Sequence, residues 1–339
     1  MASNTGPIRV IHIGLGPIGA AVVCQVASRK GFRIVGAVDI DTKKVGRDLG
    51  EVCGLGRSLK VKVSGDATKA IKASKPDVAV LCTNSSLKKV LPQIEGILKL
   101  GVPIVSTTEE LAYPSKANLR YAREIHELAK KHKVAVLGTG VNPGFVMDAL
   151  PITLTGVCER VEAIRVDRIQ DARIRRLPFQ QKIGAGLTRQ QFQKKVDDAS
   201  VRHVGLTESV SMIADALGWK LDRITDEIQP KIAAAAVASE FLSVEPGLVC
   251  GIVQDGIGYR LGRPLITLHM EAYLGAPESF DAVEITGSPA LKMKLAGGVH
   301  GDIATASITV NSIPKILDVP PGLHTMRDMP IPSFFGGVR

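Results

Sequence analysis

Short apolar runs alternate with amphipathic stretches along the first part of the chain. The apolar runs, typical of buried strands, lie at residues 10–13, 33–38, 76–82, 103–106 and 133–137. The longest amphipathic stretch, residues 115–132, has apolar positions at helical spacing and predicts a helix. Because strands and helices alternate from residue 8 to 137, we expect an α/β fold with a doubly wound parallel sheet of the Rossmann type.

The pattern changes after about residue 148. Residues 161–170 alternate between polar and apolar types, which predicts a strand with one wet face. Further strands are expected at 248–259, 265–274 and 282–285, helices at 189–199, 205–218 and 302–317, and a loop at 180–187. We therefore expect a second α/β domain on a mixed or antiparallel sheet, with domains at 1–148 and 149–301 and a C-terminal helix and tail at 302–339.

A glycine-rich turn joins the first predicted strand to the first predicted helix. Gly14, Gly16 and Gly19, with Pro17 and Ile18 between them, fit the G-x-G-x-x-G fingerprint. In that fingerprint the glycines allow a tight turn and a close approach of the backbone to a pyrophosphate at the helix N-terminus. A strand, turn, helix, strand and acid all appear in order, so we expect a dinucleotide-binding site.

The acid that ends the second strand bears on the choice of cofactor. Asp39 lies 20 residues after Gly19, where the fingerprint places a carboxylate for the ribose hydroxyls. That carboxylate favours NAD because it would repel a 2′-phosphate. Lys43, Lys44 and Arg47 could instead neutralise such a phosphate or form a solvated face, so NADP also stays open.

Small polar residues follow the later strands of this half. Parallel strands present their carboxyl ends to the ligand crevice of such a sheet. The residues expected there to contact the cofactor are Thr83, Asn84, Thr107, Asn142 and Pro143. For Asn142 and Pro143 the alternative is a simple turn before the chain crosses to the second domain.

Charge and cysteine usage exclude several classes of function. The net charge of +10 suggests nucleic acid, but the basic residues are interleaved with acids and aromatics are only 4%, so we expect no nucleic-acid binding. No apolar run reaches the roughly 18 residues of a membrane span, and the N-terminus lacks an apolar signal-peptide core. The five scattered cysteines predict reduced thiols and a cytoplasmic protein, and no metal-ligand spacing is present.

Four motifs carry a resemblance to a known family. Residues 107–114 (TTEELAYP), 138–145 (GTGVNPGF), 203–209 (HVGLTES) and 301–306 (GDIATA) resemble the 2,4-diaminopentanoate dehydrogenases and the related native amine dehydrogenases. More distantly, the layout resembles dihydrodipicolinate reductase, which implies that the C-terminal helix returns to the Rossmann domain. The resemblance implies reversible oxidative deamination of an amine or diamino acid, with NAD(P), ammonia and a small carbonyl compound as the other reactants.

Two rival functions stay open. A dihydrodipicolinate-type imine reductase would share the fold, but the His-His-x-x-Lys run typical of that family is absent. A non-catalytic dinucleotide sensor would bind the cofactor without turning it over. For quaternary structure we expect a homodimer, with the sheet of the second domain as the pairing surface.

The chemistry needs a carboxylate beside the nicotinamide, where it can accept a proton and stabilise a cationic iminium. Glu109, just past a strand end, matches the family's catalytic position by its spacing to Asn142. Glu110 is the neighbouring alternative. On an extended segment adjacent side chains point in opposite directions, so only one of the two would face the cofactor. Both could instead be carboxylates that stabilise a helix N-terminus.

The resemblance also implies a substrate pocket. Its polar residues would be Arg168, Gln170, His203, His269 and Thr305, and Phe145 would line an apolar part. Arg168 could hold a substrate carboxylate through two hydrogen bonds. The alternatives are ordinary ones: a salt bridge for Arg168, a helix cap for His203, and core positions for His269 and Phe145.

Overall fold

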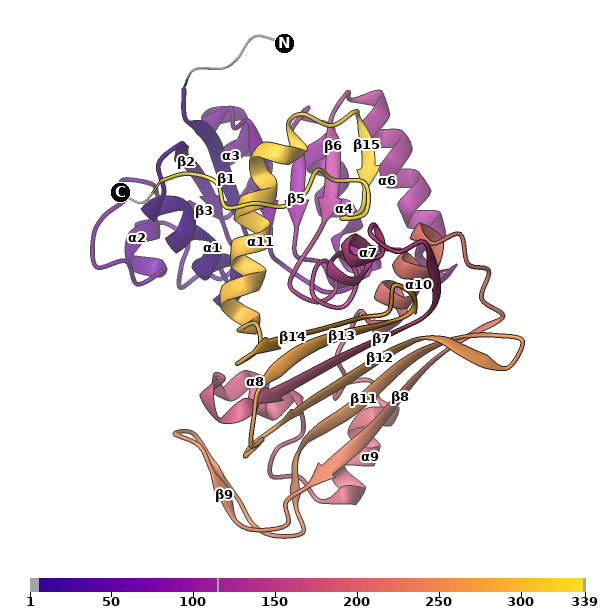
Figure 1. Cartoon of the computed structure of the whole chain (residues 1–339). Helices are drawn as coiled ribbons and strands as arrows, with labels where there is room; N and C mark the ends of the chain where they lie inside the picture. The colour runs from indigo at the N-terminus through magenta and orange to yellow at the C-terminus, as the bar shows by residue number, and fades with distance from the viewer. Residues whose placement is uncertain (1–5, 115, 338–339) are drawn as a thin grey trace. The chain divides into compact units, whose positions relative to one another are not determined.

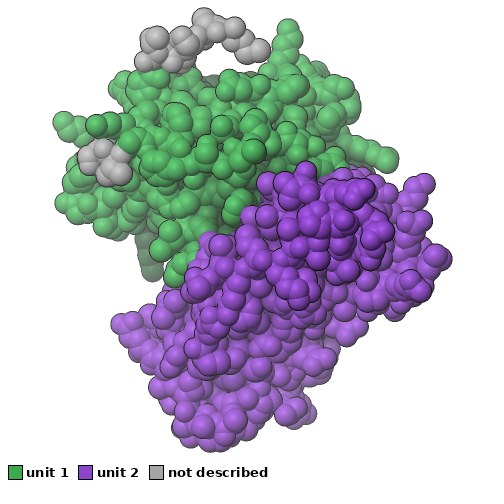
Figure 2. Space-filling view, in the orientation of Figure 1, with its two compact units in different colours: residues 1–145, 300–339 green, residues 146–299 purple. Residues whose placement is uncertain are grey.

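The computed structural model describes residues 6–114 and 116–337. It contains two compact units, one formed by residues 1–145 with 300–339 and the other by residues 146–299 (Figure 2). The chain therefore passes from the first unit to the second and back. The boundaries that we placed at residues 148 and 301 lie a few residues beyond these two crossings.

The first unit is built on a seven-stranded parallel sheet (Figure 1). Its order is β15-β6-β5-β4-β1-β2-β3, and every neighbouring pair is parallel. The strands are β1 (Ile8–Ile13), β2 (Phe32–Val38), β3 (Val63–Ser64), β4 (Val78–Leu81), β5 (Ile104–Ser106), β6 (Ala135–Gly138) and β15 (Gly322–His324). This confirms the doubly wound parallel sheet.

Helices cover both faces of this sheet. On one face α1 (Pro17–Ser28) packs against α11 (Gly301–Ile316), and on the other lie α3 (Ala67–Ser74), α4 (Leu87–Leu98) and α6 (Leu119–Lys131) (Figure 1). The shorter helices are α2 (Leu49–Val52), α5 (Glu109–Ala112) and the 3-10 turn η1 (Lys116–Asn118). Fully buried aliphatic side chains on β1, β4, β5, α4 and α6 form the core on the second face.

Two details of this unit differ from the expectation. The helix predicted over 115–132 is a 3-10 turn followed by a helix that begins only at Leu119, and Ser115 lies outside the described residues. The C-terminal tail adds β15 to the edge of the sheet beside β6, which the sequence did not predict. A three-residue strand after two prolines is too short to show an alternating pattern.

The second unit is built on a six-stranded mixed sheet of order β14-β13-β7-β12-β11-β8. β7 and β12 are parallel, and the other pairs are antiparallel. Its strands are β7 (Arg160–Asp171), β8 (Arg223–Ile232), β11 (Val249–Arg260), β12 (Arg263–Tyr273), β13 (Phe280–Ser288) and β14 (Leu291–Ala296), and β9 (Val237–Ala238) and β10 (Ser243–Val244) form a separate hairpin.

One face of this sheet is buried and the other is half-buried. The strands alternate accordingly: Ile164, Val166, Leu268 and Gly256 are buried, while their chain neighbours are not. Helix α10 (Leu206–Ala216) packs on the buried face, since a Cβ on Gly256 would lie 2.9 Å from the Cβ of Leu206. The remaining helices are α7 (Ala149–Thr155), η2 (Ala172–Ile174), α8 (Leu177–Lys182) and α9 (Arg189–Asp197).

One prediction for the second unit needs correction, and two of its strands were not expected. Residues 177–182 form α8, where we expected the loop over 180–187 to begin. β8 was missed because its isoleucines, Ile224, Ile228 and Ile232, lie four apart and it contains Pro230. β14 was missed although Leu291, Met293 and Leu295 alternate with polar residues at period two.

The described part of the chain contains neither a helix suited to span a membrane nor a cluster of side chains suited to bind a metal ion. None of its helices combines the length and the apolar character needed to cross a membrane. Within the same residues, no group of three or more histidine, cysteine or acidic side chains is arranged to hold a metal ion.

His12 in the middle of β1 makes the fold sensitive to acid. Its ring is buried, and neither ring nitrogen has a hydrogen-bond partner among the described residues. Burial lowers the pKa of His12 from 6.5 to about 3, because the charged form would lose its hydration. The unfolded chain binds a proton near pH 6.5 and the folded one does not, so His12 costs stability as pH falls below 6.5.

We expect His12→Leu to remove this cost. At pH 5 the cost is about 2 kcal/mol, which is 1.36 kcal/mol for each of roughly 1.5 pH units. Urea unfolding at pH 7 and pH 5 should therefore show a smaller loss of unfolding free energy in the variant than in the parent. His132→Gln, at the end of α6, serves as the control. An equal loss in parent and His12→Leu would contradict this role.

Candidate active site

The candidate cofactor site begins at the turn between β1 and α1, and the glycines explain its shape. Gly14 has φ +89°, and a Cβ there would lie 2.4 Å from the carbonyl oxygen of Cys82. A Cβ on Gly19 would lie 2.0 Å from the carbonyl oxygen of Gly14. Neither position accepts a side chain, because the turn, the end of β4 and α1 pack directly on one another.

Gly16 differs from the other two glycines. A Cβ built on it meets nothing within 4 Å, so this backbone faces open space. Gly16 is also the N-cap of α1, and Pro17 occupies the first turn. The helix is twelve residues long, and its N-terminus is open and carries a glycine. Such a terminus fits a dinucleotide pyrophosphate, because its N–H groups and the helix dipole favour negative charge.

Asp39 lies beside this turn, just past the end of β2. Its Oδ2 accepts a hydrogen bond from the Leu15 N–H (2.8 Å) and pairs with the Lys44 ammonium (3.1 Å), and Oδ1 accepts one from the Asp41 N–H (2.9 Å). Burial alone would raise the pKa of Asp39, but these donors outweigh it and hold that pKa below its usual value. The carboxylate is therefore ionised and fixed against the glycine turn.

The loops after β4 and β5 are bound to each other. Thr108 donates from its hydroxyl to the carbonyl of Asn84 (2.8 Å), and the Ser106 hydroxyl donates to Leu81 (3.0 Å). The Thr83 hydroxyl donates to Gln93 (2.9 Å). These bonds hold Thr83, Asn84 and Thr107 at the carboxyl ends of two adjacent strands, the edge at which Rossmann sheets bind their ligands.

The carboxylates of Glu109 and Glu110 differ in their hydrogen-bond partners. They begin α5, so they do not lie on an extended segment as expected, and their side chains do not point in opposite directions. Glu110 accepts a hydrogen bond from the Leu87 N–H (2.7 Å) at the start of α4, and its own N–H donates to Ser85. Glu109 is half-buried, and its carboxylate makes no hydrogen bond or ion pair with the described residues.

The loop after β6 brings further residues to the same edge. Asn142 and Pro143 are buried, and Phe145 is half-buried. The Thr305 hydroxyl, in the first turns of α11, accepts a weak hydrogen bond from the Val141 N–H (3.4 Å). Because β6 lies beside β5, the first unit carries the fingerprint turn, Glu109 and this loop along one edge of its sheet.

In the second unit Arg168 forms an ion pair with the protein itself. Its Nη1 lies 2.6 Å from Asp281, and both side chains are at most 3% exposed. Its Nη2 and the Gln170 amide both donate to the carbonyl of Val299, at 2.9 and 3.1 Å. This geometry matches the salt bridge given as the alternative, because the Arg168 guanidinium is bonded to Asp281 and Val299 rather than left for a substrate carboxylate.

His203 is held by its backbone. The side-chain amide of Gln254, which is fully buried, accepts from the His203 N–H (2.8 Å) and donates to the His203 carbonyl (2.9 Å) and to Asp226 (2.7 Å). Burial raises the pKa of Asp226. The sequence did not single out Gln254 or Asp281, because their partners lie 51 and 113 residues away along the chain.

His269 lies on the opposite face of the sheet from Arg168. Arg168 is in register with Met270, and His269 with Asp167, and adjacent side chains on a strand alternate between faces. His269 sits between Asp255 (2.8 Å) and Glu271 (3.1 Å), and the hydrogen bond to Asp255 raises its pKa above the usual value despite burial. One pocket cannot be lined by both, so the structure separates His269 from Arg168 and Gln170.

Comparison with known families matches nearly the whole chain. Residues 145–338 match the model of the 2,4-diaminopentanoate dehydrogenase C-terminal domain. Residues 8–139 match the model of the dihydrodipicolinate reductase N-terminus. The first model covers more than half of the chain, and the second accounts for the Rossmann unit.

Individual relatives agree with this assignment. The 2,4-diaminopentanoate dehydrogenase of Acetoanaerobium sticklandii is 35% identical over 337 residues, which covers 97% of this chain and 95% of that protein. The amine dehydrogenase of Streptomyces virginiae is 22% identical over 97% and 98% of the two chains. The solved structure of amine dehydrogenase from Mycobacterium smegmatis is 27% identical, covers 98% of both chains and has a TM-score of 0.86. The chain therefore belongs to the 2,4-diaminopentanoate dehydrogenase family and is an oxidoreductase, an NAD(P)-dependent amine dehydrogenase.

Proposed function

We propose that this enzyme deaminates a 2,4-diamino acid reversibly with NAD and that Glu109 is its acid–base group. A dinucleotide held at the Gly14–Gly19 turn would supply the hydride acceptor for the amine carbon, and the hydride donor in the aminating direction. The observation that carries the proposal is the contrast between two neighbours: Glu110 is bound to the start of α4, while the Glu109 carboxylate is left available at the carboxyl end of β5. The choice of a diamino acid is supported by the relative of 35% identity, which is a 2,4-diaminopentanoate dehydrogenase.

The residues divide the work as follows. The backbone at Gly16 leaves room for the pyrophosphate, Gly14 and Gly19 allow the tight turn that presents it, and Asp39 offers its carboxylate to the ribose hydroxyls. Glu109 accepts a proton from the substrate ammonium, and after this proton passes to solvent its carboxylate again carries a negative charge that stabilises the positive iminium. Asn142, Pro143, Phe145 and Thr305, which cluster after β6 and on α11, are proposed to shape the pocket.

A carboxylate-free amine is a second candidate substrate. The ion pair between Arg168 and Asp281 favours this candidate. Arg168 could otherwise hold a substrate carboxylate, but its guanidinium is already bound to Asp281. NADH oxidation with ammonia and a panel of ketones, with and without a carboxylate, tests both candidates and the rival of a non-catalytic sensor. Ammonia-dependent turnover supports a dehydrogenase, and the faster ketone identifies the substrate class. A protein that binds NADH and never oxidises it would contradict the proposed function.

The cofactor preference should depend on Asp39. Asp39→Ala should lower the NAD/NADP ratio of kcat/KM by roughly 10- to 100-fold, since hydrogen bonds to charged groups contribute about 1.5–3 kcal/mol. The same change frees Lys44, whose ammonium now pairs with Asp39, to meet a 2′-phosphate. Asp41→Asn is the matched control, because it keeps an acceptor for the Lys43 N–H and removes only a more distant charge, 4.0 Å from the Lys44 ammonium. A parent enzyme that already prefers NADP would contradict the proposal.

We also propose that the active form is a homodimer paired through the half-buried face of the second unit's sheet. That face mixes apolar side chains such as Val253 and Ile257 with Asp167, His269 and Glu271. Ile257→Arg should place an unpaired charge in the interface and convert the dimer into monomers, which light scattering coupled to size-exclusion chromatography would show. A parent protein that is monomeric at micromolar concentration would contradict it.

A further inference from the structure

The outer edge of the first unit's sheet is only partly covered. β3 pairs with β2 at Ala37 and Val38 alone, and no other described strand lies beyond β2. Residues 33–35 of β2 therefore form an open strand edge. Such edges present backbone N–H and C=O groups on which another strand can pair.

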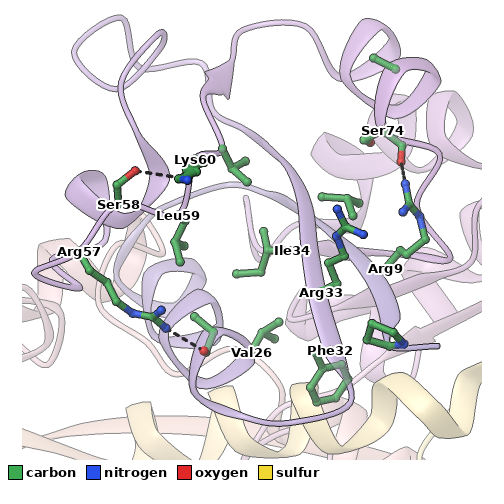
Figure 3. A pocket seen from close by; sticks show the side chains of 15 residues that line it. Arg9, Val26, Phe32, Arg33, Ile34, Arg57, Ser58, Leu59, Lys60 and Ser74 are labelled. Carbon is green, nitrogen blue, oxygen red and sulfur yellow. Dashed lines mark hydrogen bonds between the residues drawn. The ribbon is translucent and has the colours of Figure 1, made fainter. Parts of the chain in front are cut away.

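A groove runs along this open edge. Its volume is about 760 Å³, and its walls come from β2, from the end of α1 and from residues 57–61 (Figure 3). Lys60 has φ +57°, a left-handed conformation unusual for a non-glycine residue, and its N–H is held by the Ser58 hydroxyl (3.1 Å). Residues 57–61 thus line the groove instead of pairing with β2, and the volume falls within the range of protein ligand sites.

The charged lining of the groove has one sign. Arg9, Arg33, Arg57 and Lys60 line it, and no acidic side chain does. Two guanidinium groups are fixed by carbonyl oxygens: Arg9 binds Ser74 and Lys75, and Arg57 binds Ala27. Arg33 and Lys60 are exposed and form no ion pair with the described residues. The excess charge therefore favours an anionic partner.

Basic side chains line the groove on one face of β2, and apolar side chains line it on the other. Arg9 and Arg33 are in register on adjacent strands, on the side of α3, where Arg9 reaches the carbonyl of Ser74. Ile34 lies on the other face with the partly buried Leu59 and Val61 (Figure 3). An added strand would send alternate side chains to these two faces. The lining therefore matches a segment in which acidic and apolar residues alternate.

We propose that this groove binds an extended acidic segment of a partner protein, which adds to the edge of β2 as a strand. The Ile8 N–H donates to the carbonyl of Gly31, so Gly31 faces β1. By alternation along the strand, the N–H and C=O of Ile34 face the groove and are available to the partner's backbone. Main-chain hydrogen bonds would supply affinity, and the two faces would supply specificity.

The probe is a blocked, fluorescein-labelled heptapeptide of alternating glutamate and valine, added to the NADH-saturated enzyme. Fluorescence anisotropy should show saturable binding, and the double variant R33E/K60E should weaken it at least tenfold. R123E/K130E, which reverses two exposed charges on α6, is the matched control and should keep affinity within twofold. Hydrogen exchange of residues 32–36 should slow when the peptide binds, while turnover and thermal unfolding of R33E/K60E stay at the parent values.

Several results would overturn the proposal. One is absence of binding, and another is binding that R33E/K60E leaves unchanged or that R123E/K130E weakens equally. A heptapeptide with proline at alternate positions cannot complete the strand pairing, so equal affinity for it would exclude strand addition. Displacement of the peptide by tripolyphosphate or by a single-stranded oligonucleotide, without slower exchange at residues 32–36, would show a general anion surface instead.

Discussion

Replacing Glu109 with glutamine is expected to lower kcat by roughly 10²- to 10⁴-fold while NADH affinity stays within about threefold. Glutamine keeps the size and the hydrogen-bonding capacity but removes the basicity and the negative charge. The dinucleotide contacts proposed here come from the glycine turn and Asp39, so binding does not depend on this side chain. Steady-state turnover, with NADH binding followed by fluorescence, measures the two effects separately.

Glu110→Gln is the matched control for that experiment. Its oxygen can still accept the Leu87 N–H at the start of α4, so most of the activity should remain. If the Glu110 variant were inactive and the Glu109 variant active, the assignment of the two neighbours would be reversed. If both turned over at the parent rate, the acid–base group would lie elsewhere.

Asp281→Asn is expected to lower the free energy of unfolding by about 3–5 kcal/mol, because it leaves a buried guanidinium without its counter-ion. Arg168 and Asp281 are 3% and 2% exposed, and burial already lowers the pKa of Arg168, an effect that Asp281 opposes. Chemical denaturation of parent and variant at pH 7 measures the loss. A loss below 1 kcal/mol would contradict a structural role for this pair.

Two further variants separate the lost pair from the loss of one charge. Glu284 lies on the same strand as Asp281 and forms an exposed ion pair with Lys292 of β14. Glu284→Gln should cost little, because surface pairs contribute about 0–1 kcal/mol. The double variant R168M/D281L should recover much of the stability, since replacing a whole buried pair by apolar residues is often close to neutral.

The Rossmann unit could be predicted because its signals are local. Buried parallel strands appear as short apolar runs, and the turn at Gly14–Gly19 carries its own spacing. β8 and β15 gave no such signal, since one has isoleucines four apart and the other has only three residues. β14 does alternate at period two, so this strand could be predicted from the sequence alone.

The candidate site was harder to predict from the sequence, because it depends on contacts between residues that are far apart along the chain. That Glu110 holds the start of α4 depends on a bond to Leu87, 23 residues earlier. The position of His269 on the face opposite Arg168 depends on the register of β12 against β7, which no local pattern fixes. Residue types therefore predicted which side chains could act in catalysis or binding. They did not predict which of these side chains are bound to other parts of the protein.

The central claim is tested most directly by the stoichiometry of amine oxidation. The enzyme is incubated with NAD and 2,4-diaminopentanoate, and NADH and ammonium are measured in the same reaction. The account predicts that the two products appear in equal amounts and that Glu109→Gln lowers both rates together. NADH formed without ammonium would contradict amine oxidation, and no NADH with either a diamino acid or a simple amine would contradict the proposed function as a whole.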